Sequence, residues 1–450
     1  MPARPNSWLR PAILLAAALC LASQLLGPDA IGIANNGDFG KVYGYLSLAP
    51  RGPETNFVYF QPEYTYSARN FWNSPYHSAE TALAWAATRL AGATREGAGF
   101  DLRWLGALHA SLCLAALAMF LLACRPFPLY ALAPLLLFTD VCYTAYLNSF
   151  YMDAAALCGL LLMTAAAVWL VTDRTAAPLC AFIAAALLFA TSKAQHSIWA
   201  WLPAAFLLWH AARHRCHRAL AASGAALVLC AGVAMLLTTD GSYRGQAVFN
   251  VIFYRLGPAG ADLRELGVAP EEFRFRGMHA YSEGAPAADR RWTEQFYART
   301  GVARLLHWYL RHPLRTSCFL AGTLRDAAPE MRPENLSNFP QAAGRAPGAR
   351  TTRFALWSDL RAAMLRHWPW HMPVWYLLFA AGCAWSRSPL KWLGLGIAVL
   401  GAGEFVAASL GDALDAGRHL FLFHAATDLT VCFAVAWLAR GYTAKRRSTP

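Results

Sequence analysis

Side chains that could carry out group transfer are concentrated in five short polar segments of an otherwise apolar chain. Carboxylates can take a proton from a hydroxyl group, whereas Lys, Arg and His can stabilise a phosphate. The segments are NNGDFGK (35–41), TDVCYTAYLNSFYMD (139–153), TSKAQH (191–196), TTDGSYRG (238–245) and GDALDAGRH (411–419). Short loops need little charge for solubility, so this enrichment indicates a site, provided that the fold brings the segments together.

The candidate carboxylates are Asp38, Asp153 and Asp140, and each also has a structural explanation. Asp38 lies in an Asn-Gly-Asp turn, where the side chain often bonds the local backbone. Asp153 can cap the helix that follows it, and Asp140 lies near the end of an apolar helix, where a structural partner would also suit it. The cationic candidates, which could bind phosphate or anchor the chain at lipid headgroups, are Lys193, Arg244 and Arg418.

The sequence predicts neither a zinc site nor a disulfide framework. His367 and His371 have the i, i+4 spacing of a metal pair, but Pro369 between them would disturb the helix that such a site needs. Their HWPWH context is typical of an aromatic belt at a membrane interface. Most of the 11 cysteines lie within apolar runs without a C-x-x-C pair, which predicts core packing.

The elements that must position these residues are predicted to be transmembrane helices. Apolar residues make up 57% of the 450 residues and charged residues 14%, in long uncharged runs that approach the roughly 20 residues needed to cross a bilayer. We expect an all-α, multi-pass integral membrane protein forming one domain, 1–450. The ten predicted helices are 11–27, 104–124, 127–147, 154–171, 178–191, 196–212, 219–237, 371–385, 392–410 and 419–438.

Basic residues fall in alternate connections between these helices, as the positive-inside rule requires of cytoplasmic loops. They are Arg4, Arg10, Arg125, Arg174, Arg213, Arg215, Arg218, Arg387, Lys391, Arg440, Lys445, Arg446 and Arg447. Ten crossings then place both termini on the cytoplasmic side. The first apolar run could instead be a secretory signal, but no A-x-A-like site follows it, so we expect an uncleaved helix.

The same topology places two large segments outside the membrane, 28–102 and 238–370, together with all five polar segments. This indicates a site at the outer membrane surface. Within the second large segment, 302–322 mixes Leu, Trp and Phe with Arg and His. That pattern suits a helix lying on the membrane surface or one packed over the bundle.

The order and shared sidedness of these motifs resemble the GT-C type of membrane glycosyltransferase, and within it the bacterial glycan-biosynthesis hexose transferases of the WsfD-like family. The resemblance is carried by NNGDFGK, YLNSFYMDAAAL, TSKAQH and DAGRHLFLF, spread over most of the chain. It implies outward-facing sugar transfer in a bacterial plasma (inner) membrane from a polyprenyl-phosphate donor, with Asp38 as general base or metal ligand and Asp153, or secondly Asp140, assisting. The family pattern favours Glu where this chain has Asp153. Candidates for the phosphate are Lys193, Arg244, Arg418 and His419.

We therefore expect a hexosyltransferase that acts on a glycan or lipid-linked acceptor outside the membrane and binds no nucleic acid. No cofactor is predicted with certainty, and a divalent metal stays open. The sequence contains no G-x-x-x-x-G-K nucleotide loop, which weakly favours a lipid-linked donor. The main alternative is a transporter or flippase of a lipid-linked sugar. A third is an acyltransferase or glycan polymerase, for which His196 is a candidate.

Overall fold

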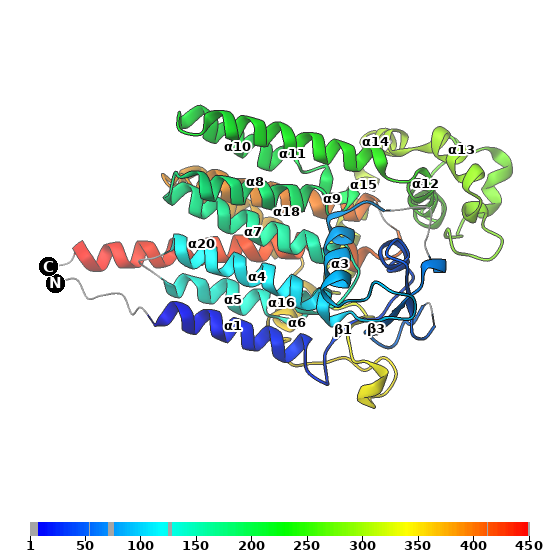
Figure 1. Ribbon diagram of the computed structural model, residues 1–450. Helices are drawn as coiled ribbons and strands as arrows, with labels where there is room; N and C mark the ends of the chain where they lie inside the picture. The colour runs from blue at the N-terminus through cyan, green and yellow to red at the C-terminus, as the bar shows by residue number, and fades with distance from the viewer. Residues whose placement is uncertain (1–7, 54, 71–75, 125–127, 412, 449–450) are drawn as a thin grey trace.

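A computed structural model describes residues 8–53, 55–70, 76–124, 128–411 and 413–448, without the side chains of residues 70, 128, 242 and 439–448. Arg4 and Arg125, which the topology prediction used, lie outside these residues. The chain is mostly helical, and the helices that run side by side form a bundle (Figure 1). They are α1 (Leu9–Leu25), α4 (Arg103–Ala123), α5 (Leu132–Phe138), α6 (Val141–Leu147), α7 (Asp153–Thr172), α8 (Ala176–Ala190), α10 (Trp201–Arg213), α11 (Arg218–Thr238), α17 (His371–Trp385), α18 (Lys391–Gly411) and α20 (Phe421–Ser448).

Every helix range predicted from hydropathy overlaps one of these helices or a pair of them, although 196–212 begins five residues before α10 and 419–438 ends ten residues before α20. Within the described residues, five helices are long and apolar enough to cross a membrane, or six if the bent pair α5 and α6 forms one span. The helices α1 and α8 are apolar but shorter. The count of ten crossings therefore stays a prediction. Because α1 begins and α20 ends at the same end of the bundle, the arrangement suits an even number of crossings (Figure 1).

The single helix predicted over 127–147 is broken into two. After a short 3-10 turn at Pro128–Ala131, α5 ends at Phe138, and α6 leaves it at an angle of 70°. The break has a local cause, because Asp140 has extended backbone and its carboxylate accepts a hydrogen bond from the backbone N–H of Cys142. An Asp in this position caps a new helix instead of continuing the old one.

The core of the bundle is built around α7, which is the most deeply buried of the membrane-length helices. Small residues let its neighbours approach closely. A Cβ atom added to Gly159 would lie 2.8 Å from the backbone N of Phe189 on α8, so glycine is required there. A Cβ atom added to Gly106 on α4 would overlap the side chain of Asn148, which donates hydrogen bonds to the carbonyls of Leu25 and Ile31. Asn148 thus joins α4, α6 and the exit of α1.

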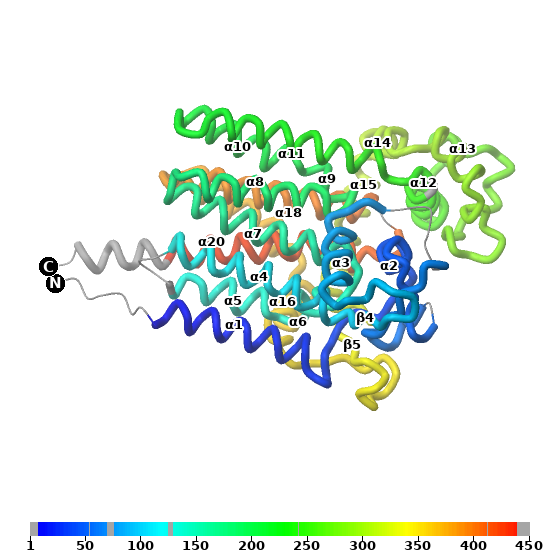
Figure 2. The backbone as a smooth tube through the Cα atoms, viewed as in Figure 1, coloured from blue at the N-terminus to red at the C-terminus, as the bar shows by residue number. Residues whose placement is uncertain are grey.

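Most of the two large segments predicted to lie outside the membrane folds together at one end of the bundle, whereas α16 of the second segment lies along the bundle, where Arg361 bonds to Asp428 on α20 (Figure 1). The first contains β1 (Gly32–Ile33), α2 (Gly40–Tyr43), β2 (Leu48–Pro50), β3 (Glu63–Tyr66), α3 (Ala79–Leu90) and β4 (Gly99–Asp101). The second contains α12 (Gly241–Phe249), α13 (Arg290–Thr300), α14 (Val302–Arg311), α15 (Pro313–Gly322), β5 (Leu336–Asn338) and α16 (Leu356–His367). Strand β1 pairs antiparallel with β5, while β2, β3 and β4 form a separate antiparallel sheet. Figure 2 traces the backbone through this region and labels β4 and β5. These short strands were not predicted.

The amphipathic stretch 302–322 is two helices, α14 and α15, which meet at Pro313. One face of α14 is buried, and the phenol of Tyr309 on this face donates a hydrogen bond to the carbonyl of Leu410 near the end of α18. Leu306 and Leu310, which lie beside this buried face, are 54% and 81% accessible. The stretch therefore packs over the bundle and also presents an apolar ridge outward.

Candidate functional site

The predicted carboxylate Asp38 lies between two cations at the outer end of the bundle. It follows β1 and directly precedes the entry to α2, and its side chain is 24% exposed. Its Oδ1 is 2.6 Å from Nζ of Lys41, one turn further along the chain, and its Oδ2 is 2.7 Å from Nη2 of Arg418. The ammonium of Lys41 also lies 4.2 Å from the ring centroid of Tyr243 on α12. Three of the five polar segments therefore meet at this point.

Arg418 is held in place independently of Asp38. It lies in α19 (Ala416–His419), just before α20, and is almost fully buried. Its Nε donates to Asp415 at 2.6 Å, and its guanidinium lies 4.5 Å from the ring centroid of Tyr151. The Tyr151 phenol in turn donates to Asn36 in the loop that carries Asp38. The segment after α1, the start of α7 and the segment before α20 are thereby locked together.

These contacts define the charge state of Asp38. Burial alone would raise the pKa of Asp38, but the neighbouring Lys41 and Arg418 outweigh burial and hold this pKa well below its usual range. Burial opposes the charge of Arg418, whereas Asp415, Tyr151 and Asp38 together raise its pKa well above the usual value. In this arrangement Asp38 is a fixed carboxylate and a weak base.

A second ion pair lies beside the first and is sealed from solvent. Asp153 is the first residue of α7, where a negative charge suits the helix N-terminus. Both of its carboxylate oxygens accept hydrogen bonds from Nζ of Lys193, at 3.2 and 3.3 Å, and both side chains are at most 5% exposed. Nε2 of His196 lies 3.5 Å from Oδ1 of Asp153. The structure therefore brings Asp153 and Lys193, from two predicted segments, into direct contact.

Glu404, which the sequence analysis did not single out, links the parts of this site. It is fully buried within α18, where Oε1 lies 2.7 Å from Nδ1 of His196 and Oε2 accepts from Nε2 of Gln195 at 2.8 Å. The side-chain carbonyl of Gln195 lies 3.2 Å from Nδ1 of His419. The signal was available, because a lone carboxylate within an apolar helix is costly unless it is paired or functional. Lys41 lay in a quoted motif but was not selected either.

Two other predicted residues lie in different surroundings. Both carboxylate oxygens of Asp140 accept backbone N–H bonds, from Cys142 and from Ser358 at the start of α16, at 3.0 Å each. Arg244 donates to the carbonyl of Thr239 at 2.7 Å. Among the described side chains, neither residue bonds to Asp38, Asp153, Lys193 or Arg418. The structural explanation of Asp140, a helix partner, fits these contacts.

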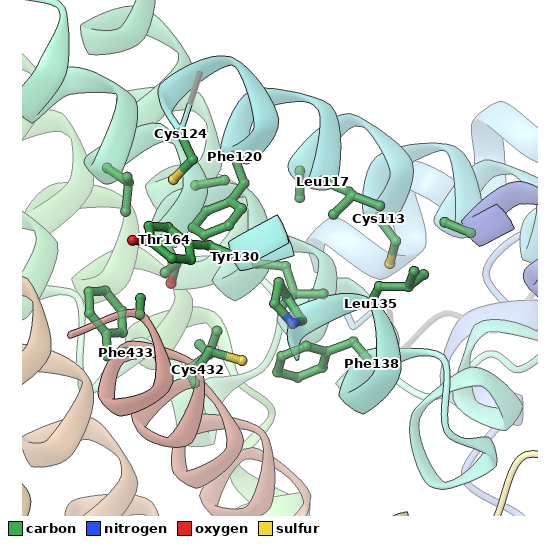
Figure 3. A pocket seen from close by; sticks show the side chains of 18 of the residues that line it. Cys113, Leu117, Phe120, Cys124, Tyr130, Leu135, Phe138, Thr164, Cys432 and Phe433 are labelled. Atoms are coloured by element: carbon green, nitrogen blue, oxygen red, sulfur yellow. The ribbon is translucent and has the colours of Figure 1, made fainter. Parts of the chain in front are cut away.

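A large cavity in the bundle is separate from the ion pairs. It lies between α1, α4, α5, α7 and α20 and has a volume of about 110 Å³ (Figure 3). Its lining is almost entirely apolar, for example Leu117, Phe120, Phe138 and Phe433, with the hydroxyl of Thr164 among them. None of the paired acidic and basic residues lines it. This cavity can accommodate hydrocarbon and offers no charged group for chemistry.

The site does not fit a divalent metal at Asp38. Each oxygen of this carboxylate already faces a cation, and the approach of a metal would add like charge. Across the described parts of the chain, no group of three or more His, Cys, Asp or Glu side chains is arranged to hold a metal ion. The metal-ligand alternative for Asp38 therefore lacks partners in this arrangement.

Comparisons with known proteins identify a membrane-domain family. The family described as YfdI N-terminal transmembrane domain matches residues 6–449. No curated protein matches the sequence significantly. Among solved structures, the chain is similar to the Archaeoglobus fulgidus oligosaccharyltransferase tethered with an acceptor peptide containing the NVT sequon, at 13% identity and a TM-score of 0.39. That match covers 97% of this chain and 51% of the other, so this chain spans about half of its length.

Proposed function

The chain belongs to the YfdI N-terminal transmembrane domain family and is a membrane protein, and from the site at its outer end we propose that it is a glycosyltransferase. In this proposal it moves a hexose from a polyprenyl-phosphate donor to a cell-surface glycan or lipid-linked acceptor on the extracytoplasmic side. One observation carries the proposal. Polar segments far apart in sequence converge, with Asp38 bonded to Arg418, Asp153 bonded to Lys193, and Glu404 joining the two through His196, Gln195 and His419.

The residue types suit the chemistry of this transfer. An acceptor hydroxyl must lose a proton, which Asp38 can accept, and the departing donor phosphate gains negative charge that cations stabilise. Arg418 and Lys41 lie beside Asp38 and can bind that phosphate. The buried pair of Asp153 with Lys193 shapes the inner wall of the site. The resemblance to WsfD-like hexose transferases and the polyprenyl-phosphate donor belong to this proposal.

The surroundings of the site favour transfer over transport. A flippase needs a path for a polar sugar through the membrane, whereas the cavity of Figure 3 is apolar. The ionisable residues within the helices are engaged with one another, as Asp428 on α20 is with Arg361 on α16 at 2.7 Å. Such pairs join helices and do not line that cavity.

Glycan composition of the parent organism tests the proposal. The comparison is between the wild type, a deletion strain, and the deletion strain complemented with either the wild-type gene or Asp38→Asn at matched membrane expression. We expect a hexose to disappear from the surface glycan on deletion, to return with the wild-type gene and to stay absent with Asp38→Asn. Full restoration by Asp38→Asn would remove Asp38 from the mechanism and make transport the better explanation.

A further inference from the structure

The cations suited to a donor phosphate are already occupied by carboxylates. Lys41 and Arg418 each contact Asp38, Arg418 also contacts Asp415, and Lys193 contacts Asp153. A phosphate that entered this site would meet paired charges instead of a free cationic pocket. Its binding must therefore include the displacement of one carboxylate or a contact with some other group.

The two ion pairs differ in how easily they can exchange. The side chains of Asp38 and Lys41 are 24% and 25% exposed, so solvent and a headgroup can reach them. Those of Asp153 and Lys193 are at most 5% exposed, and separation of this pair would leave a buried charge without a partner. Asp415, whose side chain is 31% exposed, bonds Arg418 through Nε, whereas Asp38 contacts both Lys41 and Arg418. Displacement of Asp38 therefore opens both cations to a phosphate at low cost.

Arg418 is prepared for such an exchange. Its Nε is bonded to Asp415 and its guanidinium is stacked on Tyr151, whereas Nη2 faces Asp38. If Asp38 moved away, these two contacts would still hold the guanidinium in place. The Nη2 group of Arg418 and the ammonium of Lys41 would then be available to donate hydrogen bonds to phosphate oxygens. An arginine binds phosphate well through two N–H groups.

We propose that the donor phosphate binds by replacing Asp38 on Lys41 and Arg418. Donor binding thereby releases Asp38 to act as the base. This inference rests on the proposed function. No covalent bond changes in this exchange, since one anion replaces another on the two cations. The consequence is that donor binding must precede proton removal from the acceptor. Asp38 is a weak base while both cations hold it, and it becomes able to accept the acceptor's proton only when a donor is present.

Binding of a short polyprenyl phosphate distinguishes this exchange from a merely structural Asp38. The full-length protein in lipid nanodiscs is titrated with farnesyl phosphate, and with farnesol as the probe that lacks phosphate. We expect Asp38→Asn to bind farnesyl phosphate more tightly than the wild type, by a few-fold to about tenfold, because the competing charge is gone. Lys41→Gln should bind it more weakly by a similar factor, and farnesol affinity should not change.

Asp101→Asn is the matched control, since the partly exposed Asp101 pairs with Arg103 in the same outer region. It should bind farnesyl phosphate like the wild type. Thermal unfolding in the same nanodiscs checks that each variant is folded. If Asp38→Asn does not fold, Asp38→Ser, which keeps a small polar side chain in the turn, takes its place.

The outcomes separate the exchange from the function on which it rests. Weaker or unchanged binding by folded Asp38→Asn, with normal binding by the wild type, would overturn the exchange and leave the transferase proposal standing. Failure of every folded variant and of the wild type to bind farnesyl phosphate would instead overturn the phosphate-linked donor, and the exchange with it. Tighter binding together with loss of hexose transfer supports both.

Discussion

At the scale of single residues, Glu404 bears directly on how the site is held. It lies about 10 Å inside the outer end of α18, as judged from the helical rise per residue. A carboxylate at such a depth is costly in free energy unless polar partners satisfy it. Its two oxygens are shared between His196 and Gln195, and these side chains reach Asp153 and His419 respectively. Glu404 is therefore a positioning residue for both arms of the site.

Glu404→Gln should lower hexose transfer by roughly ten- to a hundredfold. Loss of the charge weakens the contact with His196, and the side-chain amide no longer offers two acceptor oxygens to His196 and Gln195. Binding of farnesyl phosphate should change by less than about threefold, since Lys41 and Arg418 do not contact Glu404. Transfer and binding are measured on the same membrane preparation. Glu283→Gln, at an exposed glutamate of the outer region, is the control. Parallel losses of transfer and of folded protein would show that Glu404 acts only on stability.

The residues of the site were only partly accessible to sequence reasoning. Asp38, Asp153, Lys193 and Arg418 were selected because polar groups stand out against apolar helices. Their pairing was not accessible, because Asp38 and Arg418 are 380 residues apart and nothing local encodes that contact. The alternative roles of Asp140 could not be separated either, since its second partner, Ser358, lies 218 residues away.

At the scale of elements, hydropathy located the helices well, whereas their interruptions needed tertiary contacts. The bend between α5 and α6 depends on Asp140, whose carboxylate caps α6 and also receives the backbone N–H of Ser358 on α16. The strands were missed because they are two to four residues long, too short to show an alternating pattern. They form because the two outer segments meet and pair, as β1 does with β5.

Asp140→Ala should reduce the free energy of unfolding by about 1–2 kcal/mol, because it removes one helix cap and one link to α16. The binding of farnesyl phosphate should persist, since Asp140 does not contact the ion pairs at Asp38 and Asp153. Unfolding is followed by tryptophan fluorescence in detergent. Thr175→Ala is the matched control, because Thr175 precedes α8 without a side-chain capping bond and should cost little. A loss of phosphate-lipid binding in folded Asp140→Ala would return this residue to the site.

At the scale of the whole molecule, all the proposed chemistry depends on sidedness. Most of the folded outer segments and the start of α7, which carries Asp153, lie at one end of the bundle, and the start of α1 and the end of α20 lie at the other (Figure 1). The basic connections predict that the latter end faces the cytoplasm. A donor and an acceptor would then meet at the outer leaflet, where the partly exposed Asp38 can be reached without crossing the bundle.

Two native cysteines can test this orientation without engineered probes. Cys216 is exposed in the connection between α10 and α11, and Cys318 is exposed on α15 in the outer region. In intact spheroplasts, a membrane-impermeant maleimide should label Cys318 and leave Cys216 unlabelled, while permeabilised cells should show both labels by peptide mass spectrometry. Cys318→Ser identifies the outer signal. Labelling of Cys216 alone in intact cells would invert the topology, and it would place Asp38 where a cytoplasmic nucleotide sugar, instead of a lipid-linked donor, is the available substrate.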